Sequence, residues 1–171
     1  MANPSPHAAL ARESLRYYLE TGKKMSVPNN LPPELEQRAG AFVSLKKFGE
    51  LRGCIGTFQP TQDSIAAEII EMAVSAGTQD PRFNPVRIEE LPDIDFSVDV
   101  LSQPEPIDNM DKLDPQKYGV IVKKGYRSGL LLPMLEGVET VEEQVDIAMQ
   151  KAGISPSEEV ELYRFSVARY R

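Results

Sequence analysis

Three segments of the chain repeat apolar residues every three or four positions, which is the spacing of an amphipathic helix. The first segment, 6–21, follows Ser5, which is a typical N-cap before a proline at the first helical position. The second segment runs from a Thr61 cap to Gly77, and the third from the capping box of Thr140 to the residue before Gly153. The sequence therefore predicts about three helices.

Other segments alternate apolar and polar residues, which is the pattern of a half-buried strand. The clearest is Ile94 to Val100. A hairpin of 41–47 and 51–58 is predicted around Phe48-Gly49-Glu50, further strands over 118–123 and 128–132, and a last strand over 161–168.

The order of these elements is helix, hairpin, helix, strand, hairpin, helix, strand, and no internal repeat is visible in the sequence. Strands and helices do not alternate regularly, so the pattern predicts an α+β fold with a mostly antiparallel sheet. At 171 residues, a single domain over 1–171 is expected. The segment 102–115 is polar and contains three prolines, so it is expected to be a connection and a possible break between two lobes.

Charge and composition exclude several classes of protein. Nineteen Lys and Arg stand against 26 Asp and Glu, a formal net charge of −7, which disfavours nucleic-acid and membrane binding. The first 20 residues contain charges and no apolar core, so no signal peptide is expected and the predicted location is cytoplasmic. One cysteine and one histidine rule out a disulfide within the chain and a cysteine or histidine metal cluster, and no cofactor is expected.

The segment 51–58, Leu-Arg-Gly-Cys-Ile-Gly-Thr-Phe, has the composition of a reactive site. Alternation along a strand places Glu50, Arg52 and Cys54 on one face, with Leu51 and Ile55 facing the core. A guanidinium near a thiol lowers its pKa. The flanking glycines, Gly53 and Gly56, leave room for a ligand beside the sulfur. Thr57 directly follows Gly56 in the sequence.

Simpler interpretations of this segment stay open. A lone cysteine is often a small buried apolar residue, and Glu50 could hold Arg52 in a surface ion pair. Nucleophilic catalysis also needs a base, and the single histidine, His7, is expected to be a solvated residue before the first helix. A Cys–His dyad is therefore disfavoured.

A second cluster is the loop Asp80-Pro-Arg-Phe-Asn-Pro85. Arg82 between two prolines has a restricted backbone, which suits a fixed anion-binding fork. The alternative is a surface loop in which Asp80 and Arg82 pair with each other or with the backbone.

These blocks resemble the AMMECR-one family. The octapeptide 51–58, the loop 80–86 followed by Glu90-Leu-Pro92, and the later blocks 97–101, 129–133 and 151–153 match its pattern in order and spacing. Two positions depart from it, because Tyr118 stands where a histidine is common and Met134 where a glutamine is common.

The resemblance implies two lobes around an antiparallel sheet, with a cleft near the Arg–Gly–Cys segment. It also implies an AmmeMemoRadiSam-type system, with a Memo-like protein and a radical S-adenosylmethionine enzyme as partners. No activity is established for the family by this resemblance, and the single cysteine excludes the radical enzyme itself.

Two functional hypotheses follow. In the first, the protein is an enzyme or enzyme component acting on a small anionic or modified-residue substrate, with Cys54 and Arg52 catalytic and Gly53, Gly56, Thr57, Asp80 and Arg82 binding. In the second, it is an adaptor that docks one of these partners through the Arg52-Gly53-Cys54 face. A buried neutral thiol favours docking, and an exposed thiolate favours chemistry.

Overall fold

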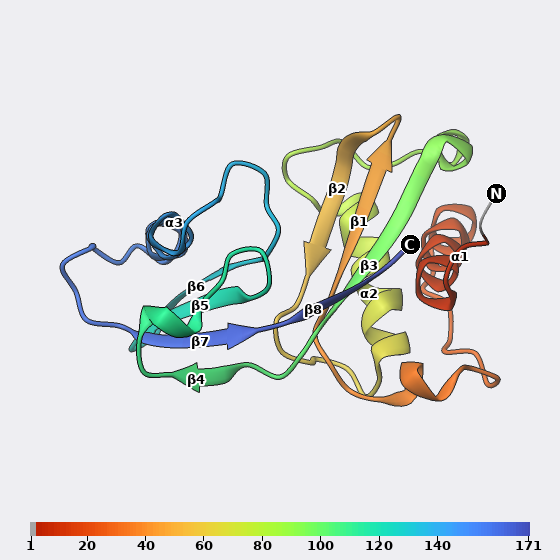
Figure 1. Ribbon diagram of the computed structural model, residues 1–171. Helices are drawn as coiled ribbons and strands as arrows, with labels where there is room; N and C mark the ends of the chain where they lie inside the picture. Colours follow the sequence, from red (N-terminus) through yellow and green to blue (C-terminus); the bar gives the residue numbers. More distant parts are fainter. Residues whose placement is uncertain (1–2) are drawn as a thin grey trace. The chain divides into compact units, whose positions relative to one another are not determined.

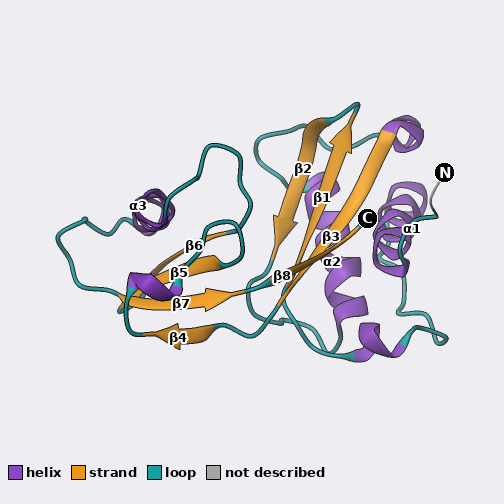
Figure 2. Ribbon diagram, in the orientation of Figure 1, coloured by secondary structure: helices purple, strands orange, loops and turns teal. Residues whose placement is uncertain are grey.

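The computed structural model describes residues 3–171, which form two compact units (Figure 1). Unit 1 comprises the residues up to Val100 together with Ala168–Arg171, and unit 2 comprises Leu101–Val167. Helices and antiparallel strands occur in both units, so the α+β class and the number of α-helices predicted from the sequence are confirmed (Figure 2). None of the helices within residues 3–171 is long and apolar enough to cross a bilayer.

Unit 1 is a four-stranded sheet covered on one face by two helices. Its strand order is β2-β1-β3-β8. The apolar core lies between sheet and helices and includes Leu15, Val43, Leu45, Ile69 and Val98, all fully buried. The elements are α1 (Pro6–Thr21), η1 (Pro33–Glu36), β1 (Ala41–Lys47), β2 (Glu50–Gly56), α2 (Ile65–Thr78), η2 (Ile88–Asp93), β3 (Ile94–Leu101) and β8 (Val167–Tyr170).

Unit 2 is a second four-stranded sheet, in the order β4-β7-β5-β6, packed against one helix. Its core contains Val120, Val122, Ala148 and Met149. The elements are β4 (Glu105–Ile107), η3 (Met110–Lys112), β5 (Gly119–Lys124), β6 (Arg127–Leu131), α3 (Val141–Ala152) and β7 (Glu161–Phe165).

The two units repeat one topology, which the sequence did not reveal. Each has a hairpin, a helix and a third strand, in the sheet orders β2-β1-β3 and β6-β5-β7. The registers also correspond, because Leu45 lies opposite Gly53 and Phe96, as Val122 lies opposite Gly129 and Leu162. The fourth strand comes from elsewhere in the chain in both cases, β8 in unit 1 and β4 in unit 2.

A glycine lets the helix approach the second hairpin strand in each unit. A Cβ on Gly53 would lie 2.2 Å from the carbonyl oxygen of Ala76 in α2. A Cβ on Gly129 would lie 2.0 Å from the carbonyl oxygen of Ala148 in α3. Both distances are far inside van der Waals contact, so no larger residue fits without moving the helix.

The helix ends follow the sequence signals with one exception. Ser5 caps α1 and Gly22 ends it in the left-handed conformation, and Thr140 accepts from the Glu143 backbone at the start of α3. Helix α2 instead begins after Ser64, so the predicted cap at Thr61 is wrong. Thr61 is held by the buried Glu68, which accepts from both its backbone and its hydroxyl, so it cannot serve as the cap.

Two strand predictions are corrected. The connection 102–115 contains the short strand β4, which the sequence concealed because Pro104 and Pro106 flank and occupy it. The single last strand over 161–168 is two strands, β7 and β8, and these belong to different sheets. The strands therefore form two sheets rather than one.

Alanine at Gly53 or at Gly129 is expected to destabilise the protein by more than about 2 kcal/mol, because the added methyl group overlaps a helix carbonyl. Urea unfolding measures this, with Ser128→Ala, at an exposed position of β6, as the matched control within about 0.5 kcal/mol of the parent. An unchanged midpoint for either glycine variant would contradict the close approach.

Candidate functional site

A β-bulge in β2 determines where the residues of the Arg-Gly-Cys segment lie. Leu45 pairs with Gly53 and Lys46 pairs with Leu51, so Arg52 has no partner on β1. Leu51 therefore shares a face with Lys46 and is exposed, although the strict alternation predicted it in the core. The predicted common face of Glu50 and Cys54 is likewise wrong, because their partners Lys47 and Ser44 point to opposite faces of β1.

Cys54 is partly buried and held on three sides. Its Sγ lies 3.2 Å from the hydroxyl of Ser44, its partner across the sheet. Its backbone N–H donates to Asp80 Oδ2 at 3.0 Å, and its carbonyl oxygen accepts from Arg82 at 3.4 Å. No nitrogen base is among these partners.

Asp80 and Arg82 together cover the free edge of the sheet beside Cys54. The Asp80 carboxylate is almost completely buried and accepts from the Arg82 backbone N–H, Nε and Nη2 at 2.8–3.1 Å. The guanidinium holds the pKa of Asp80 far below its usual range. Because β2 is an end strand, these side chains satisfy main-chain groups that a neighbouring strand would otherwise pair. The pairing of Asp80 with Arg82, which one interpretation of this loop predicted, is present in the structure.

Arg52 is turned to the η2 segment. Its Nε and Nη2 each donate to a Glu90 carboxylate oxygen at 3.0 Å, and it also donates to the carbonyl oxygens of Asn84 and Pro85. The Arg52 guanidinium, with smaller contributions from the Arg87 N–H and from Lys47, lowers the pKa of Glu90 to about 2. Arg52 therefore fastens the segment that follows α2 to the bulge of β2.

The surroundings of Cys54 favour the neutral thiol. Burial raises the pKa of Cys54, outweighing the hydrogen bond from Ser44 and the charge of Arg82, and Asp99 and Asp80 raise it further. The sequence predicted the opposite, a pKa lowered by Arg52. Arg52 is instead neutralised by Glu90.

Unit 2 shows which of these contacts belong to the repeated architecture. Its Arg127 also bonds a loop carbonyl and a glutamate, Gly153 and Glu158, but by register Arg127 corresponds to Glu50, and the bulge residue Arg52 has no counterpart. Its Lys151 donates to the carbonyl of Leu130, the position that corresponds to Cys54. A cation on the edge carbonyl is thus common to both units and is structural, whereas the contacts of Arg52 belong to the bulge of unit 1.

The face of unit 1 that carries Cys54 differs from its counterpart. By register, Ser44, Cys54, Ser97 and Asp99 correspond to Ile121, Leu130, Tyr163 and Phe165. Four mostly apolar positions are therefore replaced by a hydroxyl, a thiol, a second hydroxyl and a carboxylate. We call these four residues of unit 1 the polar face.

Arg169 completes the polar face and was missed in the sequence. It donates from Nε and Nη2 to the two oxygens of the buried Asp99, at 2.8 and 2.9 Å. It lies on β8, about 70 residues along the chain from Asp99. No local sequence signal could have indicated this pair.

The remaining predicted binding residues support the strand. Gly53 contacts α2, and a Cβ on Gly56 would lie 2.2 Å from the Phe42 ring. Thr57 donates its backbone N–H to Ala41 and accepts from the Ala41 N–H through its hydroxyl, so it extends the pairing of β2 with β1.

His7 is not solvated as the sequence predicted. It is 2% exposed in unit 1, and its ring stacks on Tyr170 at a centroid distance of 3.6 Å. Burial outweighs the charge of Glu34 and lowers the pKa of His7.

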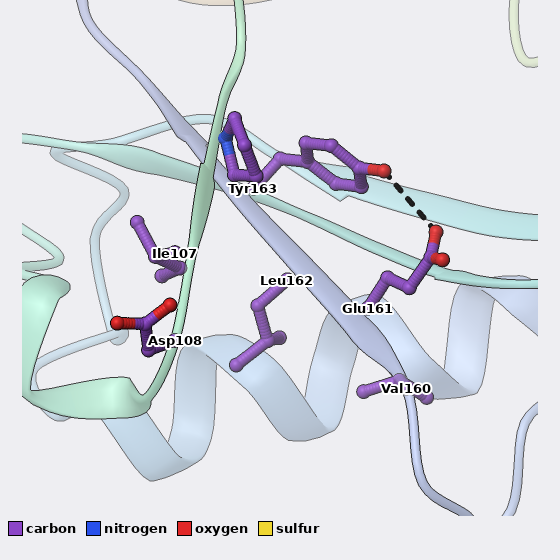
Figure 3. A pocket seen from close by; sticks show the side chains of 7 residues that line it. Ile107, Asp108, Val160, Glu161, Leu162 and Tyr163 are labelled. Carbon is purple, nitrogen blue, oxygen red and sulfur yellow. Dashed lines mark hydrogen bonds between the residues drawn. The ribbon is translucent and has the colours of Figure 1, made fainter.

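A shallow hollow of about 230 Å³ lies in unit 2 between β4 and β7 (Figure 3). Its lining includes Asp108, Glu161 and Tyr163, whose hydroxyl donates to Glu161 at 3.1 Å. The two carboxylates are exposed, and no predicted site residue lines it. Residues 3–171 contain no group of three or more potential metal ligands.

Comparison with known proteins identifies the family. The AMMECR1 family model matches residues 8–170. The chain belongs to the AMMECR1 family. It is 52% identical to a Thermotoga maritima protein, over the full length of both chains. It is similar to the crystal structure of the uncharacterized protein PH0010 from Pyrococcus horikoshii, with a TM-score of 0.87 and 34% identity, covering 95% of this chain and 88% of that one.

A relative from Clostridium acetobutylicum, protein CA_C1420, is longer. It is 54% identical over 97% of this chain, but the match covers only 36% of that protein. This chain therefore spans about a third of the length of that relative. The match supports the family assignment and assigns no activity to this chain.

A double-mutant cycle of Arg52→Gln and Glu90→Gln is expected to give a coupling of about 1–2 kcal/mol in the free energy of unfolding, because both side chains are mostly buried. The exposed pair of Arg16 and Glu20 supplies the control cycle, in which no measurable coupling is expected. Additive effects at Arg52 and Glu90 would show that the clamp does not form.

Alkylation of Cys54 by iodoacetamide is expected to have a pH midpoint above the ordinary value of about 8.5. Ser44→Ala should slow the reaction at pH 8 by roughly two- to tenfold, since it removes a hydrogen bond that lowers the pKa of Cys54. Arg52→Gln should leave the midpoint unchanged. Mass spectrometry measures the rates, and the chain has a single cysteine, so the signal is unambiguous. A pH midpoint well below 8 would instead support the hypothesis of an activated thiolate.

Proposed function

We propose that this AMMECR1-family protein is a docking module that binds a protein partner through Cys54 and the loop 80–85. The observation that carries the proposal is the surroundings of the thiol. Among residues 3–171 its Sγ bonds only Ser44 and no histidine contacts it, and burial raises the pKa of Cys54. A nucleophile needs a lowered pKa or an adjacent base, and this arrangement has neither.

The loop has the properties of a preformed recognition surface. Asp80 fixes one end to the Cys54 backbone, and Arg52 fixes the other end through the Asn84 and Pro85 carbonyls. Little conformational entropy remains to be lost on binding. Such rigidity suits an interface better than it suits a moving catalytic loop.

Arg82 is the expected anchor of this surface. Its side chain is 55% exposed although Asp80 holds one side of it, and its guanidinium lies over the Phe83 ring at 5.5 Å. Among the described residues, Nη1 has no hydrogen-bond acceptor, so it is available to a carboxylate or a carbonyl of the partner. Arginine and aromatic side chains dominate the binding energy of many interfaces.

The partner is expected to be a protein of an AmmeMemoRadiSam-type system, either the Memo-like protein or the radical S-adenosylmethionine enzyme. The family resemblance supports this choice. The length of the Clostridium acetobutylicum relative is consistent with it, because that chain joins a matching domain to almost twice as much further sequence. Fusion makes association of two modules intramolecular.

A second candidate function rests on the polar face. Ser44, Ser97 and Asp99 lie on the same face of the sheet as the thiol, where the repeated unit has mostly apolar residues, and this arrangement is suited to a small polar substrate. Cys54 would then be a nucleophile or redox thiol, activated only in the complex, and Arg82 would bind an anionic group. Cys54→Ser separates the two functions. Serine is nearly the same size as cysteine and keeps the backbone contacts to Asp80 and Arg82, so docking is retained, whereas thiol chemistry is lost.

Arg82→Lys is expected to weaken binding of the Memo-like or radical partner about tenfold, which corresponds to about 1.4 kcal/mol. Lysine keeps a positive charge beside Asp80 but lacks the fork that presents Nη1. Isothermal titration calorimetry measures the Kd. Arg87→Lys, at a side chain that is 78% exposed and outside the Asp80 network, is the matched control with unchanged affinity.

The proposal fails if neither partner forms a complex with the parent protein at micromolar concentration. It also fails if Arg82→Lys and Arg87→Lys bind equally well. Loss of the product of the assembled system in Cys54→Ser, with binding retained, would establish the second function in addition to the first.

A further inference from the structure

We propose that His7 is a pH-responsive latch that holds the last strand, β8, on unit 1 and releases it when the imidazole is protonated. This inference goes beyond the docking function and is tested without any partner. It is carried by a buried, stacked histidine that no other part of the site uses.

Two contacts join the start of α1 to β8. The His7 ring lies against the Tyr170 ring at 3.6 Å with an angle of 9° between the planes. Two residues earlier, the Ser5 N–H donates to the Arg171 backbone oxygen at 2.8 Å. Figure 1 shows the end of β8 running towards α1 within unit 1. The start of α1 and the end of β8 are therefore fastened to each other by a face-to-face stack and a hydrogen bond.

The environment of the ring disfavours a positive charge. Nδ1 is buried and has no hydrogen-bond partner among residues 3–171. His7 is in the first turn of α1, where the helix dipole repels cations and no acidic residue is present. Of the charged groups around it, Glu34 of η1 favours the imidazolium, while β8 presents the neutral Tyr170 ring. We call the arrangement in which β8 is held on unit 1 the closed state, and the one in which it has detached the open state. Burial outweighs Glu34, so the pKa of His7 in the closed state lies below its ordinary value of 6.5.

Acid therefore favours the open state. When β8 detaches, the ring reaches water and titrates near its ordinary pKa of about 6.5. Above that pH the His7 ring is neutral in both states, and protonation does not favour opening. As pH falls from 6.5 towards the closed-state pKa, only the open state gains a proton, so the opening constant rises by up to about tenfold per pH unit.

Opening of β8 also alters the polar face. The strand carries Arg169, the partner of the buried Asp99, and Asp99 lies on the same face as Cys54 because Phe42 and Ser44 oppose them on β1. Release of β8 leaves that carboxylate without its cation. Protonation at His7 is thus linked to the electrostatics around the thiol.

Amide hydrogen exchange of the free protein at pH 7.5 and pH 5.5, corrected for intrinsic rates, tests the latch. The protection of Ala168–Tyr170 should fall between these pH values by threefold or more beyond any change in β1. His7→Phe keeps a ring for the stack but cannot be protonated, so its β8 protection should be independent of pH. Arg169→Gln is the matched control, because it weakens β8 but retains His7 and the pH dependence.

His7 is the only histidine, so one imidazole resonance in the proton spectrum reports its titration in the unaltered protein. A midpoint below 6.5 that moves lower in Glu34→Gln supports the latch. The proposal is overturned by pH-independent protection of β8 in the parent, by an equal loss of protection in His7→Phe, or by a midpoint at or above 6.5. None of these results depends on partner binding, so failure of the latch and failure of the docking function are distinguishable.

Discussion

The site depends on one nearly buried carboxylate. Asp80 accepts from the backbone N–H of Cys54 and from three N–H groups of Arg82, so it joins the edge of β2 to the loop that follows α2. The same pair supplies a donor for the Cys54 carbonyl. A buried carboxylate is tolerated only because every group that contacts it is a hydrogen-bond donor and one of these groups, the guanidinium, is positively charged. The position of Arg82 at the surface follows from this requirement.

The bulge at Arg52 explains why the site differs from its sequence pattern. One extra residue between Gly53 and Leu51 breaks the alternation, exposes Leu51 and turns the guanidinium to Glu90. A guanidinium two residues from a thiol is thus no evidence of activation when the strand between them is irregular. Its charge is already neutralised by a carboxylate that is 38 positions away in the sequence.

Periodicity was sufficient to predict the helices, the two hairpins and the α+β class, because those features depend on local side-chain spacing. It failed for β4, where prolines mask a short edge strand, and for the division of 161–168 between two sheets, which is decided by distant pairing. The site shows the same limit. Cys54, Asp80 and Arg82 were identified in the sequence, whereas Ser44 and Arg169 approach them only through the register of the sheet.

The repeated topology provides an internal reference that a single sequence does not. Features shared by the two units, such as the glycine beneath the helix and the cation on the edge carbonyl, follow from building the same hairpin, helix and strand twice. Features confined to unit 1 are not needed for that architecture. The thiol, hydroxyls and carboxylate of the polar face replace mainly apolar residues, at a cost in burial free energy that the fold itself does not require. A function located at Cys54 accounts for that difference.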